Sequence, residues 1–144
     1  MFRGGTALSE GIGEKLTKLP DAPNCEVVII KPPIDVSTKY VYENLHANEL
    51  KYHPDIDGMV DAVNNKNLAL ICEKMENVLE TVTVKKYPII EELKTVMKEN
   101  GAVNSIMSGS GPTVFALYDS EYRAKKACLF MREKGYESYW TMTL

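Results

Sequence analysis

The sequence predicts an α+β domain of the ferredoxin-like split βαβ type, with several helices in its first crossover and a β-hairpin in front of it. Two observations predict this class. From residue 26 the expected elements run in the order strand, helices, strand, strand, helix, strand, which is the split βαβ order. The chain has 144 residues, 44% of them hydrophobic and 26% charged, enough for one domain with its own core.

The first 19 residues predict the hairpin. Residues 6–9 and 14–19 have strand character, and Gly11-Ile12-Gly13 between them is suited to a short link. A lone hairpin is barely stable in water, and this one has no obvious sheet partner in the chain. We therefore expect two units, a hairpin at 1–19 and a domain at 20–144.

A central strand is expected at residues 26–31, because Val27 to Ile30 are apolar on both faces. Pro32-Pro33 ends this strand. Ser37 or Thr38 then begins a short helix as its N-cap.

Three further helices should fill the crossover. The first begins at Pro54-Asp55, and the last runs from Pro88 to a stop at Gly101. Between them, apolar residues at helical spacing from Leu68 to Val82 predict one continuous helix that starts near Asn67.

The last third of the chain predicts two strands, a helix and a final strand. The strands lie near 105–107 and at 113–118, and the helix begins at Asp119 or Ser120 and ends at Gly135. Residues 137–143 close the sequence as a strand.

Composition excludes several classes of protein. The net charge is −3, so no basic field exists to hold a nucleic-acid backbone. No apolar run reaches membrane-spanning length. The cysteines number three and are widely spaced, which predicts buried free thiols and a cytoplasmic protein. Neither His46 nor His53 has a partner at metal-ligand spacing, so no metal site is expected.

Residues 107–115 carry the strongest signal of chemistry. Two serines and two glycines, Ser108-Gly109-Ser110-Gly111, lie between apolar strands and are followed by Pro112. Glycine backbone can turn its N–H groups towards an anion, and serine adds hydroxyl donors. The stretch therefore predicts a phosphate-facing turn, with a plain hairpin link as the alternative.

A second candidate is Ser37-Thr38, which follows the central strand and begins a helix. A helix N-terminus at a strand end offers free N–H groups to an anion, although a simple N-cap explains the same residues. No catalytic base, catalytic triad or P-loop lysine is recognisable.

These motifs resemble a known family. Residues 108–115 are similar to the third motif of the GHMP kinase superfamily. Residues 4–14 and 31–38 resemble the 4-diphosphocytidyl-2-C-methyl-D-erythritol kinases of that superfamily, over essentially the whole chain and in the same order. The resemblance covers the C-terminal lobe only, because the family's glycine- and serine-rich ATP loop, its N-terminal lysine and its aspartate have no counterpart here.

The resemblance implies an ATP- and Mg²⁺-dependent kinase of non-mevalonate isoprenoid biosynthesis that phosphorylates the 2-hydroxyl of its cytidine-diphosphate-linked methylerythritol substrate. Gly109, Ser110 and Gly111 match the loop near the transferred phosphate, with Ser108 beside it. Thr38 and Ser37 match the segment that reaches towards the substrate. No position matches the catalytic residues.

From this we expect a truncated kinase whose residues 1–19 are a remnant hairpin of the N-terminal lobe and whose residues 20–144 are the GHMP kinase C-terminal domain. Alone, the chain should fold, bind no ATP or Mg²⁺, and be inactive. Its exposed lobe interface, with some of Ala7, Leu8, Ile12 and Leu16, should cause self-association or leave a disordered N-terminal segment.

Two alternatives remain open at this point. The chain could be a stand-alone ferredoxin-like module that binds a small ligand and transfers nothing. It could also be a lobe of another GHMP kinase, one that acts on mevalonate-type or amino-acid alcohols.

Overall fold

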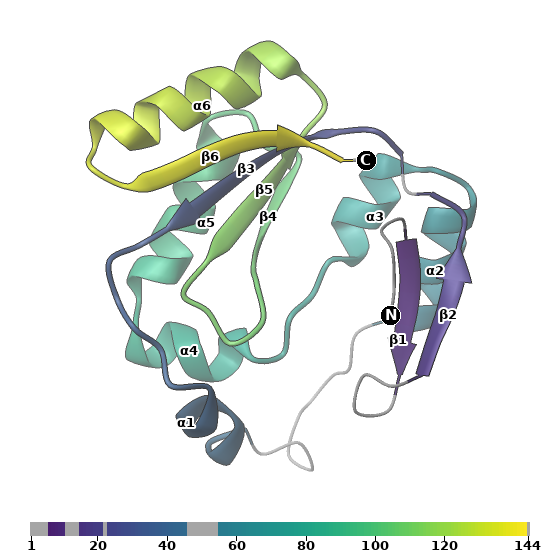
Figure 1. The fold of residues 1–144 in the computed structure, drawn as a ribbon, viewed down its shortest axis with the longest axis horizontal. Helices are drawn as coiled ribbons and strands as arrows, with labels where there is room; N and C mark the ends of the chain where they lie inside the picture. The colour runs from purple at the N-terminus through teal and green to yellow at the C-terminus, as the bar shows by residue number, and fades with distance from the viewer. Residues whose placement is uncertain (1–5, 11–14, 22, 46–54, 144) are drawn as a thin grey trace.

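The strands in the described part of the chain form two separate antiparallel sheets. The computed structural model describes residues 6–10, 15–21, 23–45 and 55–143. The strands are β1 (Thr6–Glu10), β2 (Lys15–Leu19), β3 (Glu26–Lys31), β4 (Asn104–Met107), β5 (Val114–Tyr118) and β6 (Glu137–Met142). The helices are α1 (Thr38–Glu43), α2 (Ile56–Asn64), α3 (Leu68–Lys74), α4 (Glu80–Lys86), α5 (Ile89–Glu99) and α6 (Glu121–Glu133). Figure 1 shows the hairpin β1–β2 beside α2, apart from the larger sheet.

The larger sheet has the strand order β4-β5-β3-β6, with every neighbouring pair antiparallel. Numbered along the chain from β3, this is the order 2-3-1-4 of a ferredoxin-like sheet, so the predicted fold class is confirmed. The strand β3 lies between β5 and β6, as its two apolar faces predicted. In the register, Val28 is opposite both Ala116 and Trp140.

The main core lies between this sheet and the helices α5 and α6. Val28 and Ile30 of β3 are fully buried, and they pack in one cluster with side chains of both helices. From α5 the cluster receives Ile90, Leu93 and Met97, whose spacing of three and four residues puts them on one helix face. Each such buried side chain contributes about 1.5–3 kcal/mol.

The hairpin packs on a second, smaller cluster. Ala62 and Val63 of α2 and Ile71 of α3 form it, and Leu19 at the end of β2 packs against it. On the hairpin itself, Leu16 is 47% exposed while Leu8 is half-buried. Ile12, which was expected in an apolar patch here, and the predicted glycine link lie outside the described residues.

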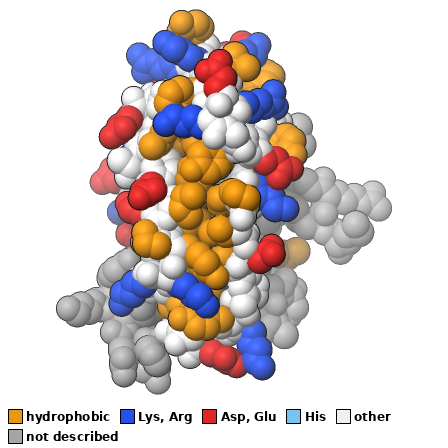
Figure 2. Space-filling view, turned by 90° about the vertical axis from the view of Figure 1, so that its left-hand side faces the viewer, with side chains coloured by type: hydrophobic (Ala, Val, Ile, Leu, Met, Phe, Trp, Pro, Cys, Tyr) orange, Lys and Arg blue, Asp and Glu red, His pale blue; other side chains and the backbone are white. Residues whose placement is uncertain are grey.

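Partly buried hydrophobic side chains pack against the main core and extend it to the surface. They include Ile34, Val36, Phe130 and Tyr136. On the side of the molecule that is at the left in Figure 1, Figure 2 shows a band of hydrophobic side chains with charged side chains along both margins.

The predicted continuous helix from Asn67 to Val82 is wrong. The chain forms α3, leaves the helix at Met75, whose backbone is extended (φ −65°, ψ 118°), and begins α4 only at Glu80. Asn77 lies in the gap. Its side chain bonds to backbone groups outside the helix, and this competition is the reason asparagine disfavours helix interiors.

The other helix boundaries agree with the sequence. Ser37, Asp55 and Ser120 cap α1, α2 and α6 by accepting a backbone N–H on their side chains. Gly101 and Gly135 follow α5 and α6 with φ of +100° and +92°, the left-handed backbone that glycine allows at a helix end.

Candidate functional site

The glycine–serine loop, residues 108–112, joins β4 to β5. The N–H of Ser108 donates to the carbonyl of Thr113 at 2.8 Å, and the N–H of Gly111 donates to the carbonyl of Ser108 at 3.0 Å. Both bonds close the link between two adjacent antiparallel strands. The hairpin interpretation of this loop therefore describes its connection correctly, and any chemistry has to come from what the loop presents outwards.

Two glycines in the loop are required by backbone conformation. Gly109 and Gly111 have φ of +56° and +91°, in the region that side chains disfavour. At Gly111 there is also no room, because a Cβ would lie 2.9 Å from the Met107 Sδ and 3.3 Å from the Thr83 Cγ2. The loop thus packs tightly on its inner side at Gly111.

The two predicted site segments meet in the structure. The Thr38 Oγ1 and the Ser110 Oγ are 3.0 Å apart, within hydrogen-bond distance, although 72 residues separate them in the chain. Ser37 is used differently, since its Oγ accepts the N–H of Tyr40 as the N-cap of α1. Of the two residues, it is Thr38 that reaches the loop.

Two side chains, Asn77 between α3 and α4 and Thr83 on α4, bond to the inner side of the loop. The Asn77 Nδ2 donates to the carbonyls of Met107 (2.8 Å) and Gly109 (2.7 Å). The Thr83 Oγ1 donates to the carbonyl of Ser110 at 2.9 Å. Neither residue was identified from the sequence. The one signal that could have pointed to them was a polar Asn and a Thr within an otherwise apolar stripe.

An ion pair supports the same region. Glu80 accepts the N–H of Met107 at 3.3 Å and pairs with Lys94 of α5. The Glu80 and Lys94 side chains are only 15% and 14% exposed, so the pair is well shielded from water. Asn77, Glu80 and Thr83 are spaced three residues apart, and all three side chains contact β4 or the loop. On the edge strand β4, the N–H and the carbonyl of Met107 are therefore both bonded to side chains.

The outer side of the loop offers free donors. Within the described part of the chain, the N–H groups of Gly109 and Ser110 donate to no protein acceptor. Backbone N–H groups in a glycine-rich turn suit a phosphate oxygen.

For a metal ion the described residues do not suffice, because no group of three His, Cys, Asp or Glu side chains among them is placed to hold one. His46 and His53 lie outside the described residues.

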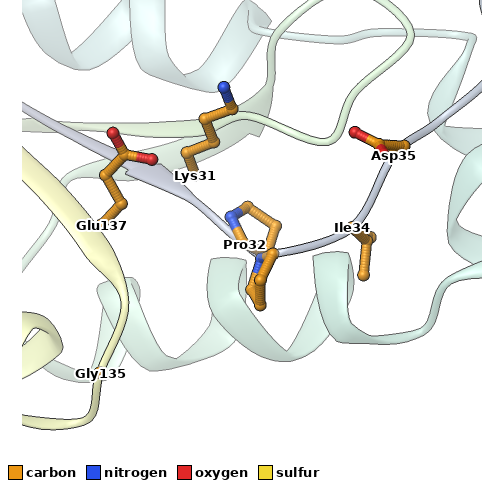
Figure 3. Close-up of a pocket in the computed structure, with 7 residues that line it drawn as sticks. Lys31, Pro32, Ile34, Asp35, Gly135 and Glu137 are labelled. Atoms are coloured by element: carbon orange, nitrogen blue, oxygen red, sulfur yellow. The ribbon is translucent and has the colours of Figure 1, made fainter.

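A hollow of about 220 Å³ lies along the segment that leads from β3 to α1 (Figure 3). The charged side chains of Lys31, Asp35 and Glu137 lie around it, with Pro32 and Ile34 between them. No residue of the predicted site lines this hollow.

The cysteines lie in the protein interior. All three are buried free thiols, as predicted. Burial raises the pKa of Cys72 to about 11 and also raises the pKa of Cys25. Because the thiolate is the reactive form, Cys25 and Cys72 are held in the unreactive state near neutral pH.

A family model decides the classification. The model described as "GHMP kinases C terminal" matches residues 59–137, which include α3, α4 and the whole glycine–serine loop. The chain belongs to the GHMP kinase C-terminal domain family.

Sequence relatives of this GHMP kinase domain have a consistent name. A 4-diphosphocytidyl-2-C-methyl-D-erythritol kinase of Lachnospira eligens is 53% identical over 131 residues, covering 91% of this chain and 46% of that protein. The kinase of the same name from Lachnoclostridium phytofermentans is 56% identical over 123 residues, covering 85% and 42%. The chain thus spans about half the length of the curated relatives it matches. The resemblance recognised in the motifs is confirmed.

Solved structures show the same fold. The crystal structure of a 4-(cytidine 5'-diphospho)-2C-methyl-D-erythritol kinase superposes with a TM-score of 0.78 at 24% identity, covering 94% of this chain and 48% of that one. A homoserine kinase from Cytophaga hutchinsonii gives a TM-score of 0.75 at 24% identity, covering 98% and 48%.

Among the described residues, no helix is long and apolar enough to cross a membrane.

Proposed function

We propose that this chain is the C-terminal lobe of an ATP-dependent kinase that phosphorylates the 2-hydroxyl of 4-diphosphocytidyl-2-C-methyl-D-erythritol, in the cytoplasm, as a step of non-mevalonate isoprenoid biosynthesis. Residues 20–144 form the lobe. The hairpin at 1–19 pairs with the sheet of the other lobe, consistent with its forming a sheet of its own here.

The observation that carries this proposal is the meeting of Thr38 and Ser110 at 3.0 Å. Thr38 comes from the segment whose motif matches this particular kinase, Ser110 comes from the third motif of the superfamily, and the two lie on one outward surface. A substrate hydroxyl held near Thr38 and a phosphate held at Ser110 are thus brought together. Phosphoryl transfer depends mostly on such positioning and on charge stabilisation.

The chain's own residues have limited parts in this chemistry. The N–H groups of Gly109 and Ser110, with the Ser110 hydroxyl, donate to oxygens of the transferred phosphate. Gly111 allows the tight backbone path, and Ser108 and Ser37 hold the two segments in shape. ATP supplies the phosphoryl group. We assign the nucleotide-binding loop, the catalytic base and the ligands of Mg²⁺ to the other lobe, because the family's motifs for them have no match in this sequence.

The experiment uses a chimera of the Lachnospira eligens kinase in which this chain replaces the segment that it matches. With ATP, Mg²⁺ and 4-diphosphocytidyl-2-C-methyl-D-erythritol, the chimera should form the 2-phosphate, and the purified chain alone should not. A folded chimera without activity contradicts the proposed substrate. Turnover by the chain alone contradicts the assignment of the catalytic groups to the other lobe.

The same chimera tests the other kinase assignment. Mevalonate and homoserine, offered in place of the cytidine diphosphate substrate, should not be phosphorylated. If one of them is the better substrate, the chain is a lobe of a different GHMP kinase. Saturable binding of an unrelated metabolite by the chain, independent of residues 1–19, would instead favour a stand-alone binding module.

A further inference from the structure

The gap between α3 and α4 places one amide side chain against the glycine–serine loop. The Asn77 Nδ2 donates to the carbonyls of Met107 and Gly109, at 2.8 and 2.7 Å, while its Oδ1 accepts the N–H of Leu79 at 3.0 Å. An asparagine amide has two N–H donors and one carbonyl. Both donors and the carbonyl are therefore engaged, and the orientation of this amide is determined by its partners.

The hydrogen bond from Asn77 to the Gly109 carbonyl determines the direction of the following N–H. The peptide unit is planar, and in its trans form the C=O and the following N–H point in opposite directions. In the described residues, only Gly111-Pro112 is cis, so the Gly109–Ser110 unit is trans. Because Asn77 holds the Gly109 carbonyl inwards, the N–H of Ser110 has to point away from Asn77, to the outer side of the loop.

A second side chain controls the next peptide unit. The Thr83 Oγ1 holds the carbonyl of Ser110 at 2.9 Å, and its methyl group faces the space where a Cβ of Gly111 would lie. Thr83 is only 1% exposed, so its hydroxyl has no water to bond to in place of this carbonyl. Two successive carbonyls of the loop are thus turned inwards, one by Asn77 in the gap before α4 and one by Thr83 on α4.

We propose that Asn77 and Thr83 are positioning residues of the phosphate site: Asn77 holds the Gly109 carbonyl inwards and so aims the Ser110 N–H at the phosphate, and Thr83 fixes the other side of Ser110 by holding its carbonyl. This inference rests on the proposed function for its role in catalysis. Its structural part, the control of the loop's orientation, is independent of any substrate.

Isosteric substitutions separate this role from packing. Asn77→Asp keeps the oxygen that accepts the Leu79 N–H but loses both donors to the loop. Thr83→Val keeps the shape and loses the hydroxyl, while Thr83→Ser keeps the hydroxyl. Asn65→Asp is the matched control, because the Asn65 amide also donates to a carbonyl, that of Asp61 at 2.9 Å, but at the end of α2 and away from the loop.

The first measurement is ¹⁵N relaxation on the 144-residue chain. In the parent chain and in Asn65→Asp, the N–H of Ser110 should have an order parameter typical of rigid backbone, about 0.85. In Asn77→Asp or Thr83→Val it should fall below about 0.6, with the signal of Ser110 displaced. Unchanged order and position of this signal in both variants overturn the proposal. If Asn77→Asp does not fold, the order and position of the Ser110 signal in Thr83→Val decide whether the proposal holds.

The second measurement is steady-state kinetics of the same variants in the chimera. Misplacing a donor by about 1 Å can cost 10²-fold in rate, so kcat should fall by about 10- to 100-fold in Asn77→Asp and Thr83→Val. The KM for the cytidine diphosphate substrate should change little, and Thr83→Ser should restore kcat. Loss of loop order with unchanged kcat overturns the catalytic role. An inactive parent chimera refutes the proposed function, while the relaxation experiment still decides whether the two residues orient the loop.

Discussion

The two glycines of the glycine–serine loop allow a sharp test, because they share a left-handed backbone but differ in surroundings. A Cβ on Gly109 would have no neighbouring atom within 4 Å, whereas a Cβ on Gly111 would meet the Met107 Sδ at 2.9 Å and the Thr83 Cγ2 at 3.3 Å. Gly109→Ala and Gly111→Ala are therefore a matched pair in which only the second change creates a clash.

The structure sets the size of each effect. At Gly109 the φ of +56° lies in the left-handed helical region, where an alanine costs about 1 kcal/mol. At Gly111 the φ of +91° lies beyond that region, so the conformational cost is nearer to about 2 kcal/mol. The contact with Met107 and Thr83 adds about 1–3 kcal/mol of overpacking. We expect Gly111→Ala to destabilise the chain by about 3–5 kcal/mol, and Gly109→Ala by about 1 kcal/mol.

Urea denaturation followed by circular dichroism measures both values on the same chain. The midpoint should fall for Gly111→Ala far more than for Gly109→Ala, with an unchanged slope. Melting temperatures should follow at about 3 °C per kcal/mol. Equal losses for the two variants would refute the claim that close packing on the inner side, and not φ alone, requires glycine at position 111.

The remaining predictions concern hydrogen bonds and titrating groups. Thr83→Val should lower the free energy of unfolding by about 1–2 kcal/mol, because it leaves the Ser110 carbonyl unpaired, and Thr83→Ser should recover most of this in the same urea assay. Hydrogen bonds from Lys74 and from the N–H of Gly58 lower the pKa of Asp55. The stabilisation of the folded state by the ionised Asp55 carboxylate is therefore complete above the ordinary carboxyl pKa. It is lost as pH falls through the pKa that Asp55 has in the folded state. A ¹³C carboxyl titration should show the pKa of Asp55 rising in Lys74→Met, and an unchanged value would contradict the pairing. Burial raises the pKa of Cys72 to about 11, so its contribution is complete below the ordinary thiol pKa and disappears as pH rises towards 11. Thiol labelling at pH 8 should be slow in the native chain and rapid in urea, and rapid native labelling would mean that Cys72 is accessible.

Much of the fold could be predicted because local signals agreed with the final packing. The strand β3 was expected to be central from its run of four apolar residues, and it lies between two neighbours. The caps at Ser37, Asp55 and Ser120 were readable because each side chain satisfies a backbone N–H close to it in sequence.

The predicted continuous helix from Asn67 to Val82 was wrong because of contacts between residues that are distant in sequence. The apolar spacing from Leu68 to Val82 continues across the break between α3 and α4, so periodicity alone indicates one helix. What interrupts it is the bonding of Asn77 to carbonyls 30 and 32 residues later in the chain. The apolar periodicity does not contain that information.

The candidate site was predictable in its parts but not in its assembly. The glycines and serines of residues 108–111 and the Ser37-Thr38 pair were visible as motifs. Their meeting depends on the tertiary contact of Thr38 with Ser110, which only the folded sheet and α1 bring about. The roles of these residues in binding stay predictions until the chimera is assayed.

The place of β3 has a consequence for how the domain is made in the cell. One of its two neighbours is β6, which is far from it in sequence, and Thr143 is bonded through both backbone and side chain to Cys25, 118 residues away. During synthesis the centre of the sheet cannot form until β6 has left the ribosome. Such non-local pairing makes folding slow and leaves apolar edges uncovered in the meantime, so this domain should depend on chaperones while it is being translated.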